Sequence, residues 1–219
     1  MILDFLEKEI KKATLLQKKI REVYIKTQNI VAESEMVAFV QPFYEMRYAL
    51  EHFSDAVLDK DGEWLTDKKL AVNEMDKMLS HLVRCYTDLL EWRFYLIKTQ
   101  MYKLTKGLST EDKTRAMPMY YSDIQPKFVE TQNLIVNIKL MPETVNYYED
   151  RINILDRVEK NSDFLLESFN ADILRELRMQ ARKNWFQATA AGLVKILFTA
   201  ITGGAVTILV QMYLKALNT

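Results

Sequence analysis

Two residues in the first quarter of the chain have side chains suited to proton transfer at a phosphate. Arg47 and His52 are separated by four residues, in the stretch RYALEH. An imidazole can transfer protons near pH 7, and a guanidinium can stabilise the negative charge that builds up on a phosphorane. The pair is therefore a candidate for chemistry on a phosphodiester.

An Arg followed by four residues and a His, within a small all-α domain, resembles the motif of the HEPN superfamily of prokaryotic defence and toxin proteins. In active members a dimer brings two such motifs together, and they promote metal-free RNA cleavage by attack of a 2′-hydroxyl on the adjacent phosphate. The resemblance covers residues 36–105. It implies that Arg47 and His52 are the catalytic residues of a metal-independent ribonuclease.

A structural role for the same two side chains is the alternative. On an ideal helix they project about 140° apart, so one helix alone cannot direct both at a single phosphate. Arg47 flanks an apolar seam and can pair with Glu51 one turn later. His52 lies on the far side of this helix, where we expect it in solvent or at an interface.

No metal site or cofactor is predicted. His81 and Cys85 are one helical turn apart and could together offer two ligands, but the sequence has no second pair of this kind to complete a zinc site. A glycine-rich phosphate loop, a nucleophile elbow and a recognisable pair of catalytic acids are also missing from the sequence. We therefore expect a non-enzymatic protein, unless the Arg-His pair is catalytic.

The composition favours a single helical domain in a reducing compartment. Thirty basic residues balance thirty acidic ones, so no overall field recruits DNA. The one cysteine cannot form an intramolecular disulfide. Five glycines and four prolines separate long stretches with helical apolar spacing, which is typical of an all-α protein.

Residues 1–184 are predicted to form an elongated cytoplasmic bundle of about five long helices. The apolar spacing places them over about 2–32, from Val40 to Val57, from Thr66 to Gly107, over 119–141 and from Pro142 onward. In the second helix one apolar seam is expected to face the core, formed by Phe39, Phe43, Met46, Leu50, Phe53 and Val57. The polar segment from Ser109 to Pro118 is predicted to be the longest loop, and Asn170 to cap a last helix.

Residues 185–219 are predicted to form a single-pass transmembrane helix with a short tail. The nineteen residues from Ile196 to Leu214 carry no charge, and as a helix they cover roughly 28 Å, close to the thickness of a bilayer core. Basic residues just before this segment are expected to lie at the cytoplasmic surface of the inner membrane. They are Arg175, Arg178, Arg182 and Lys183.

Small and polar side chains recur every four residues along the last segment. They are Lys195, Thr199, Gly203, Thr207 and Gln211. In a ring of identical helices this stripe could face neighbouring helices or a water-filled pore. In a plain tail anchor its threonines would instead bond to carbonyls of their own helix.

The leading hypothesis is an oligomeric, membrane-anchored effector that assembles with copies of itself in the lipid bilayer and, in one version, forms a pore. It resembles accessory membrane proteins of prokaryotic antiviral defence, which implies a defence-system protein or RNA as trigger. One alternative is a membrane-tethered HEPN-type ribonuclease that uses Arg47 and His52. The other is a tail-anchored coiled-coil adaptor.

Overall fold

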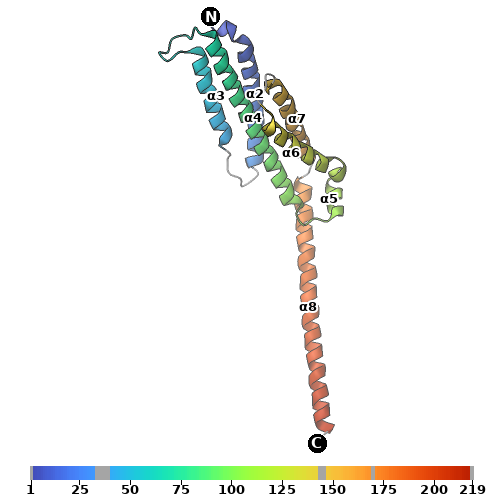
Figure 1. Ribbon diagram of the computed structural model, residues 1–219. Helices are drawn as coiled ribbons and strands as arrows, with labels where there is room; N and C mark the ends of the chain where they lie inside the picture. The colour runs from blue at the N-terminus through green and yellow to red at the C-terminus, as the bar shows by residue number, and fades with distance from the viewer. Residues whose placement is uncertain (1, 33–39, 143–146, 169–170, 218–219) are drawn as a thin grey trace.

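The chain folds into an elongated bundle of helices from which the last helix extends far beyond the others (Figure 1). The computed structural model describes residues 2–32, 40–142, 147–168 and 171–217, and from residue 196 onward it describes the backbone alone. Within these ranges the regular structure is helical, with one isolated bridge between Leu58 and Trp64. The predicted all-α class is confirmed.

Helix α4 is the centre of the bundle, and it contacts α2, α3, α6, α7 and α8. The elements follow one another as α1 (Ile2–Phe5), α2 (Glu7–Ala32), α3 (Gln41–Val57), α4 (Lys68–Thr105), α5 (Thr110–Ala116), a π-helical turn η1 (Tyr120–Ile124), α6 (Gln125–Leu140), α7 (Tyr147–Glu167) and α8 (Ala171–Leu217).

The ends of α4 follow from two local signals in the sequence. Oδ1 of Asp67 accepts hydrogen bonds from the backbone N–H groups of Lys69 and Leu70, at 2.9 and 3.1 Å, and so caps the first turn. Beyond the other end, Gly107 has φ +84°, a conformation that a side chain would strain. The predicted bounds of this helix are confirmed.

The seam predicted for α3 is confirmed at Val57, which is buried, and at Met46, which packs against the core, but it is wrong at its other described positions. Phe43, Leu50 and Phe53 are 53%, 56% and 38% exposed, whereas Ala49 and Ala56 are buried. Small side chains on one face let the backbone of α3 approach α4 closely, and that gain in packing decides which face turns inward. The row of large apolar side chains is left on the outside.

The segment predicted as the longest loop contains a helix instead. Ser109 caps α5 by accepting a hydrogen bond from the N–H of Asp112 at 3.0 Å. The helix predicted over 119–141 is confirmed as η1 followed by α6. Pro142, predicted in the first turn of the next helix, lies outside any helix, and α7 is described from Tyr147. Asn170, predicted to cap the last helix, lies outside the described residues.

The predicted single-pass transmembrane helix over 185–219 is also wrong. Among the described residues, no helix combines the length and the apolar character that crossing a membrane requires. In α8 the uncharged interval between Lys183 and Lys195 is eleven residues, about 17 Å of helix or roughly half of a bilayer core. The side chains from Ile196 to Leu214, on which the prediction rested, lie outside the described part.

Candidate functional site

Arg47 lies on the exposed face of α3. Its Nε donates to Oε1 of Glu51 at 2.9 Å, which confirms the predicted pair one turn apart. Both side chains are at least half exposed, and an exposed ion pair of this kind contributes little to stability.

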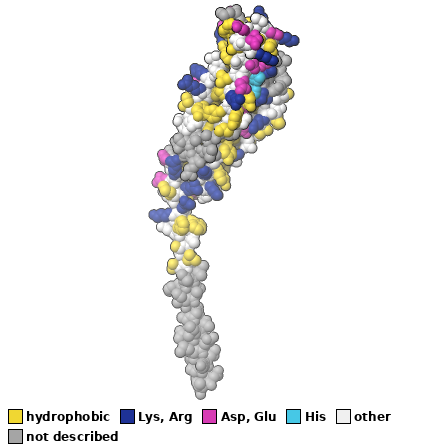
Figure 2. All heavy atoms as spheres, turned by 90° about the vertical axis from the view of Figure 1, so that its left-hand side faces the viewer, with side chains coloured by type: hydrophobic (Ala, Val, Ile, Leu, Met, Phe, Trp, Pro, Cys, Tyr) yellow, Lys and Arg dark blue, Asp and Glu magenta, His cyan; other side chains and the backbone are white. Residues whose placement is uncertain are grey.

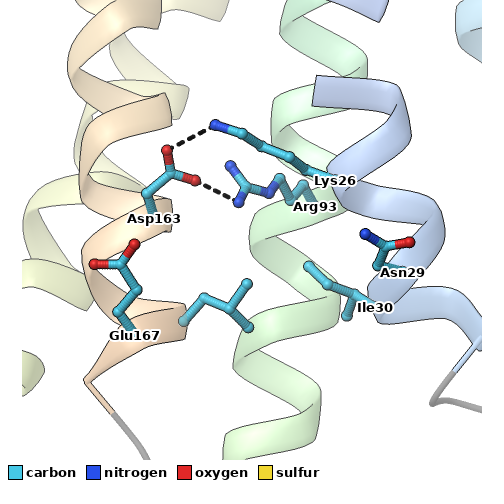
Figure 3. A pocket seen from close by; sticks show the side chains of 7 residues that line it. Lys26, Asn29, Ile30, Arg93, Asp163 and Glu167 are labelled. Atoms are coloured by element: carbon cyan, nitrogen blue, oxygen red, sulfur yellow. Dashed lines mark hydrogen bonds and ion pairs between the residues drawn. The ribbon is translucent and has the colours of Figure 1, made fainter. Parts of the chain in front are cut away.

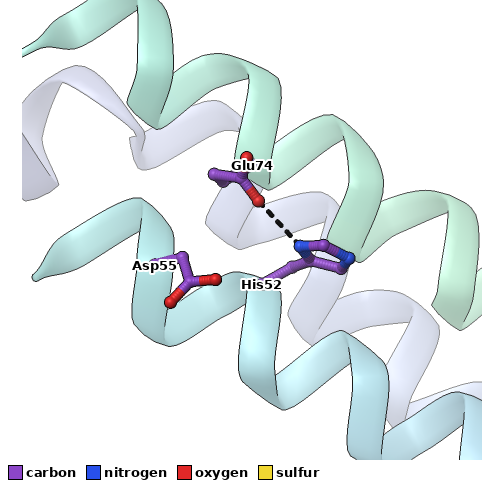
Figure 4. A group of neighbouring side chains, drawn as sticks. All are labelled: His52, Asp55 and Glu74. Carbon is purple, nitrogen blue, oxygen red and sulfur yellow. Dashed lines mark hydrogen bonds and ion pairs between the residues drawn. The ribbon is translucent and has the colours of Figure 1, made fainter. Parts of the chain in front are cut away.

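His52 lies on the opposite side of α3 and faces α4. Its Nδ1 is 2.7 Å from Oε2 of Glu74 (Figure 4). The structure therefore places His52 at an interface, one of the two surroundings expected for it. Within one copy of the chain Arg47 and His52 have separate partners, so the catalytic hypothesis depends on a second copy and stays a prediction.

A second histidine-glutamate pair bridges the same two helices, with its histidine on α4 and its glutamate on α3. Nδ1 of His81, in α4, is 2.8 Å from Oε2 of Glu45, in α3. The rings of His52 and His81 stack with their centroids 5.2 Å apart and their planes at 19°. The order Glu74, His52, His81, Glu45 thus forms a continuous array across the interface.

The sequence holds a signal for this array that the prediction missed. Glu45 and His52 are seven residues apart on α3, and Glu74 and His81 are seven residues apart on α4. Seven residues are close to two helical turns, so each pair lies on one face of its helix. When the two helices pack antiparallel, each glutamate meets the histidine of the other helix.

The array is largely shielded from solvent, and one of its glutamates also binds a lysine. Burial pushes the pKa of Glu74 upward, but the hydrogen bonds from Lys77 and His52 outweigh burial and hold that pKa below its ordinary value. Lys77 binds Oε1 at 2.7 Å and His52 binds Oε2. Glu74 is therefore a carboxylate at neutral pH and can accept a hydrogen bond or bind a cation.

Cys85 is not available for chemistry. Burial raises the pKa of its thiol to about 12, so the sulfur stays protonated and is neither a nucleophile nor a good metal ligand. Nδ1 of His81 is already engaged with Glu45. The pair His81 and Cys85 does not form a metal site here.

The four basic residues predicted at a membrane surface have different roles in the structure. Arg175 pairs with Asp172 at 3.0 Å, and Arg178 donates to the carbonyl oxygen of Lys103 in the last turn of α4 at 2.6 Å. That second contact satisfies a carbonyl at a helix end, and the cation suits the helix dipole there. Arg182 and Lys183 are exposed.

The predicted stripe along α8 is described only at its first position. Lys195 is exposed, and the side chains of Thr199, Gly203, Thr207 and Gln211 lie outside the described part of the chain. Helix packing along this stripe stays a prediction, and a pore has no support in the described residues, where no helix could cross a membrane.

A cavity of about 380 Å³ lies between α2, α4 and α7 (Figure 3). Arg93 and Lys26 both donate to Asp163 at its wall. The hydrogen bonds from Lys26 and Arg93 outweigh burial and lower the pKa of Asp163. The cavity is therefore lined by an ion-pair network that ties three helices together, and we assign it a structural role.

Comparison with known proteins finds no match among protein-family models, curated proteins or solved structures. The HEPN resemblance and the role in antiviral defence therefore stay predictions.

Proposed function

We propose that this chain is a non-enzymatic assembly protein that pairs with a second copy of itself through the outer face of α3. The observation that carries the proposal is the row of large apolar side chains on that face. Phe43 and Leu50 are both more than half exposed, and Tyr44 and Phe53 adjoin them. Figure 2, which views the molecule from its α3 side, shows hydrophobic side chains gathered on this face. Contiguous apolar patches of this kind are typical of interaction sites.

The charges on the same face favour a second copy as the partner. Arg47 and Glu51 lie among the apolar residues. In a twofold, antiparallel pair of α3 helices, Arg47 of one copy can face Glu51 of the other, and Leu50 lies near the axis. The formal charge of the chain is zero, so no net repulsion opposes the approach of two copies.

The direction of His52 supports a non-enzymatic role. Pairing through the outer face of α3 would bring two Arg47 side chains near each other, while each His52 stays turned toward α4 of its own copy. An Arg-His pair for RNA cleavage would not form at that interface.

Native mass spectrometry of the full chain tests the proposal. We expect a dimer for the wild type and a monomer for Phe43→Ser with Leu50→Ser, since the apolar contact is lost. The matched control is Val129→Ser with Val136→Ser on α6, two residues of similar exposure, which should remain dimeric. A wild-type chain that stays monomeric at every concentration contradicts the proposal.

A second candidate function, attachment to a membrane surface, is favoured by the first half of α8. Arg182 and Lys183 are followed, one residue later, by Trp185 and Phe186, which are 61% and 64% exposed on a helix that leaves the bundle. Basic and aromatic side chains together suit the interface of an anionic bilayer. The predicted inner-membrane location would follow from such a contact.

Vesicle co-sedimentation tests this second candidate. Binding should increase with phosphatidylserine content, and Arg182→Gln with Lys183→Gln should weaken it because the attraction to anionic lipid is lost. The control, Lys11→Gln with Lys18→Gln on the exposed face of α2, should bind like the wild type. Equal recovery with neutral and anionic vesicles for all variants refutes a surface contact of this kind.

A further inference from the structure

We propose that His52, Asp55 and Glu74 bind a divalent transition-metal ion between α3 and α4, a site that goes beyond the assembly function. Each residue offers one ligand atom, and these atoms all lie within 4.8 Å of one another. His52 and Asp55 are three residues apart on one face of α3, and Glu74 approaches from α4 (Figure 4).

The distances suit a metal ion after a small movement of His52 and Glu74 and a change of rotamer at Asp55. Around an ion with bonds of about 2.1 Å, neighbouring ligand atoms lie about 3.0 Å apart in an octahedral site and about 3.4 Å apart in a tetrahedral one. Nδ1 of His52 and Oε2 of Glu74 are 2.7 Å apart, so a metal can replace their hydrogen bond after a slight separation. The exposed side chain of Asp55 can change rotamer to complete the set.

The charges of the three residues also suit a divalent cation. Glu74 and Asp55 each supply a carboxylate, so two negative charges would balance the ion. Lys77 would oppose the ion, but it binds Oε1 of Glu74 and leaves Oε2 directed at His52. Its side chain is about half exposed and can move away.

The second histidine-glutamate pair would hold the first ligand in place. His81, fixed by Glu45, stacks on the ring of His52 and restricts its rotation. Metal-binding imidazoles are commonly oriented by neighbouring hydrogen-bonded groups, and such groups change affinity when removed. His81 and Glu45 are thus positioning residues.

One nitrogen and two carboxylate oxygens indicate the class of metal. An imidazole ligand favours zinc or cobalt over calcium and magnesium, which prefer oxygen ligands alone. Three protein ligands leave at least one position for water. Because the ligands come from two helices, the ion would clip α3 to α4 near the turn that joins them, and binding would stabilise the folded chain.

Titration of the full chain with Co²⁺ and Zn²⁺ after dialysis against chelator tests the site. We expect one ion per chain, visible Co²⁺ absorption bands without a thiolate charge-transfer band, and much weaker binding of Mg²⁺. Asp55→Asn should weaken Zn²⁺ binding at least about tenfold. Asp55 is exposed, so this variant should keep the helical circular dichroism of the wild type.

Two controls make the outcome decisive. Glu51→Gln removes an exposed carboxylate from the same helix, and Cys85→Ser removes the thiol; both variants should bind like the wild type. The proposal is overturned if wild-type protein binds no transition metal, if Asp55→Asn binds as tightly as the wild type, or if Cys85→Ser alone abolishes binding.

Discussion

Arg93, buried in α4 with 1% of its surface exposed, donates from Nη2 to Oδ1 of Asp163 on α7. The other oxygen of the same carboxylate accepts from Lys26 on α2 at 2.9 Å (Figure 3). One aspartate thus joins three helices. It also neutralises the guanidinium of Arg93, which is almost fully buried. Asp163 is one-third exposed and also binds Lys26, so Arg93 depends on this ion pair more than Asp163 does.

Asp163→Ala should destabilise the fold more than Arg93→Met. The first change leaves a buried guanidinium without its carboxylate, at a cost of about 3–5 kcal/mol. The second leaves Asp163 one-third exposed and still bound to Lys26, so its cost should be about 2 kcal/mol. Urea unfolding of both variants measures the difference, and an equal or reversed order would contradict the unequal dependence.

Asp88 should make stability fall as pH rises. Burial, with the charges of Glu45 and Glu91, raises its pKa to about 6, above about 3.9 for an aspartate in an unfolded chain. Between these values the folded chain keeps a proton that the unfolded chain loses. The contribution of Asp88 to stability is therefore largest below about pH 4 and falls until about pH 6.

Asp88→Asn removes this effect. The variant should be more stable than the wild type by on the order of 1 kcal/mol at pH 7.5, and the gain should disappear near pH 4. Denaturant unfolding at both pH values measures it. Asp61→Asn, in an exposed turn, is the control and should show no such pH-dependent gain; a constant gain for Asp88→Asn at both pH values would point to packing instead of ionisation.

We expect that Arg47 does not take part in RNA cleavage by this chain. We expect neither wild type nor Arg47→Ala to cleave a single-stranded RNA in the presence of chelator, because Arg47 pairs with Glu51 and His52 with Glu74. Gel analysis of end-labelled RNA is the measurement. Cleavage by the wild type that Arg47→Ala loses, with dimer formation intact, would establish the ribonuclease instead.

The sequence predicts this fold well where a local signal decides the structure. Asp67 and Gly107 set the ends of α4, and the apolar period of α2 is buried as expected at Leu16 and Val23. Prediction from the sequence fails where two faces of one helix could each pack against the core. The periodicity of α3 favours the face with Leu50, but close packing on α4 selects the alanine face.

The histidine-glutamate array shows a similar limit. The seven-residue spacing from Glu45 to His52 recurs from Glu74 to His81 and could have revealed two polar faces. Their partnership depends on the antiparallel register of α3 and α4, which is a tertiary property. Single-helix reasoning could place His52 at an interface but could not name Glu74 as its partner.

Charge exchange on the outer face of α3 gives the most specific test of the proposed dimer. If Arg47 of one copy faces Glu51 of the other, Arg47→Glu places like charges together twice at a twofold interface, and so does Glu51→Arg. Each single variant should dissociate several-fold more readily than the wild type. The double variant, with both changes, restores opposite charges across the interface and should regain most of the affinity.

The fold of one copy should hardly respond to the same changes. Arg47 and Glu51 also pair within their own helix, but an exposed pair one turn apart contributes only about 0.3–0.5 kcal/mol. Sedimentation equilibrium gives the dimer affinity, and thermal unfolding of dilute protein gives the stability of one copy. Recovery of dimerisation in the double variant, with unfolding temperatures unchanged throughout, would place the two residues across the interface. If both single variants dimerise like the wild type, the antiparallel pairing of α3 is excluded, because symmetry would double each repulsion.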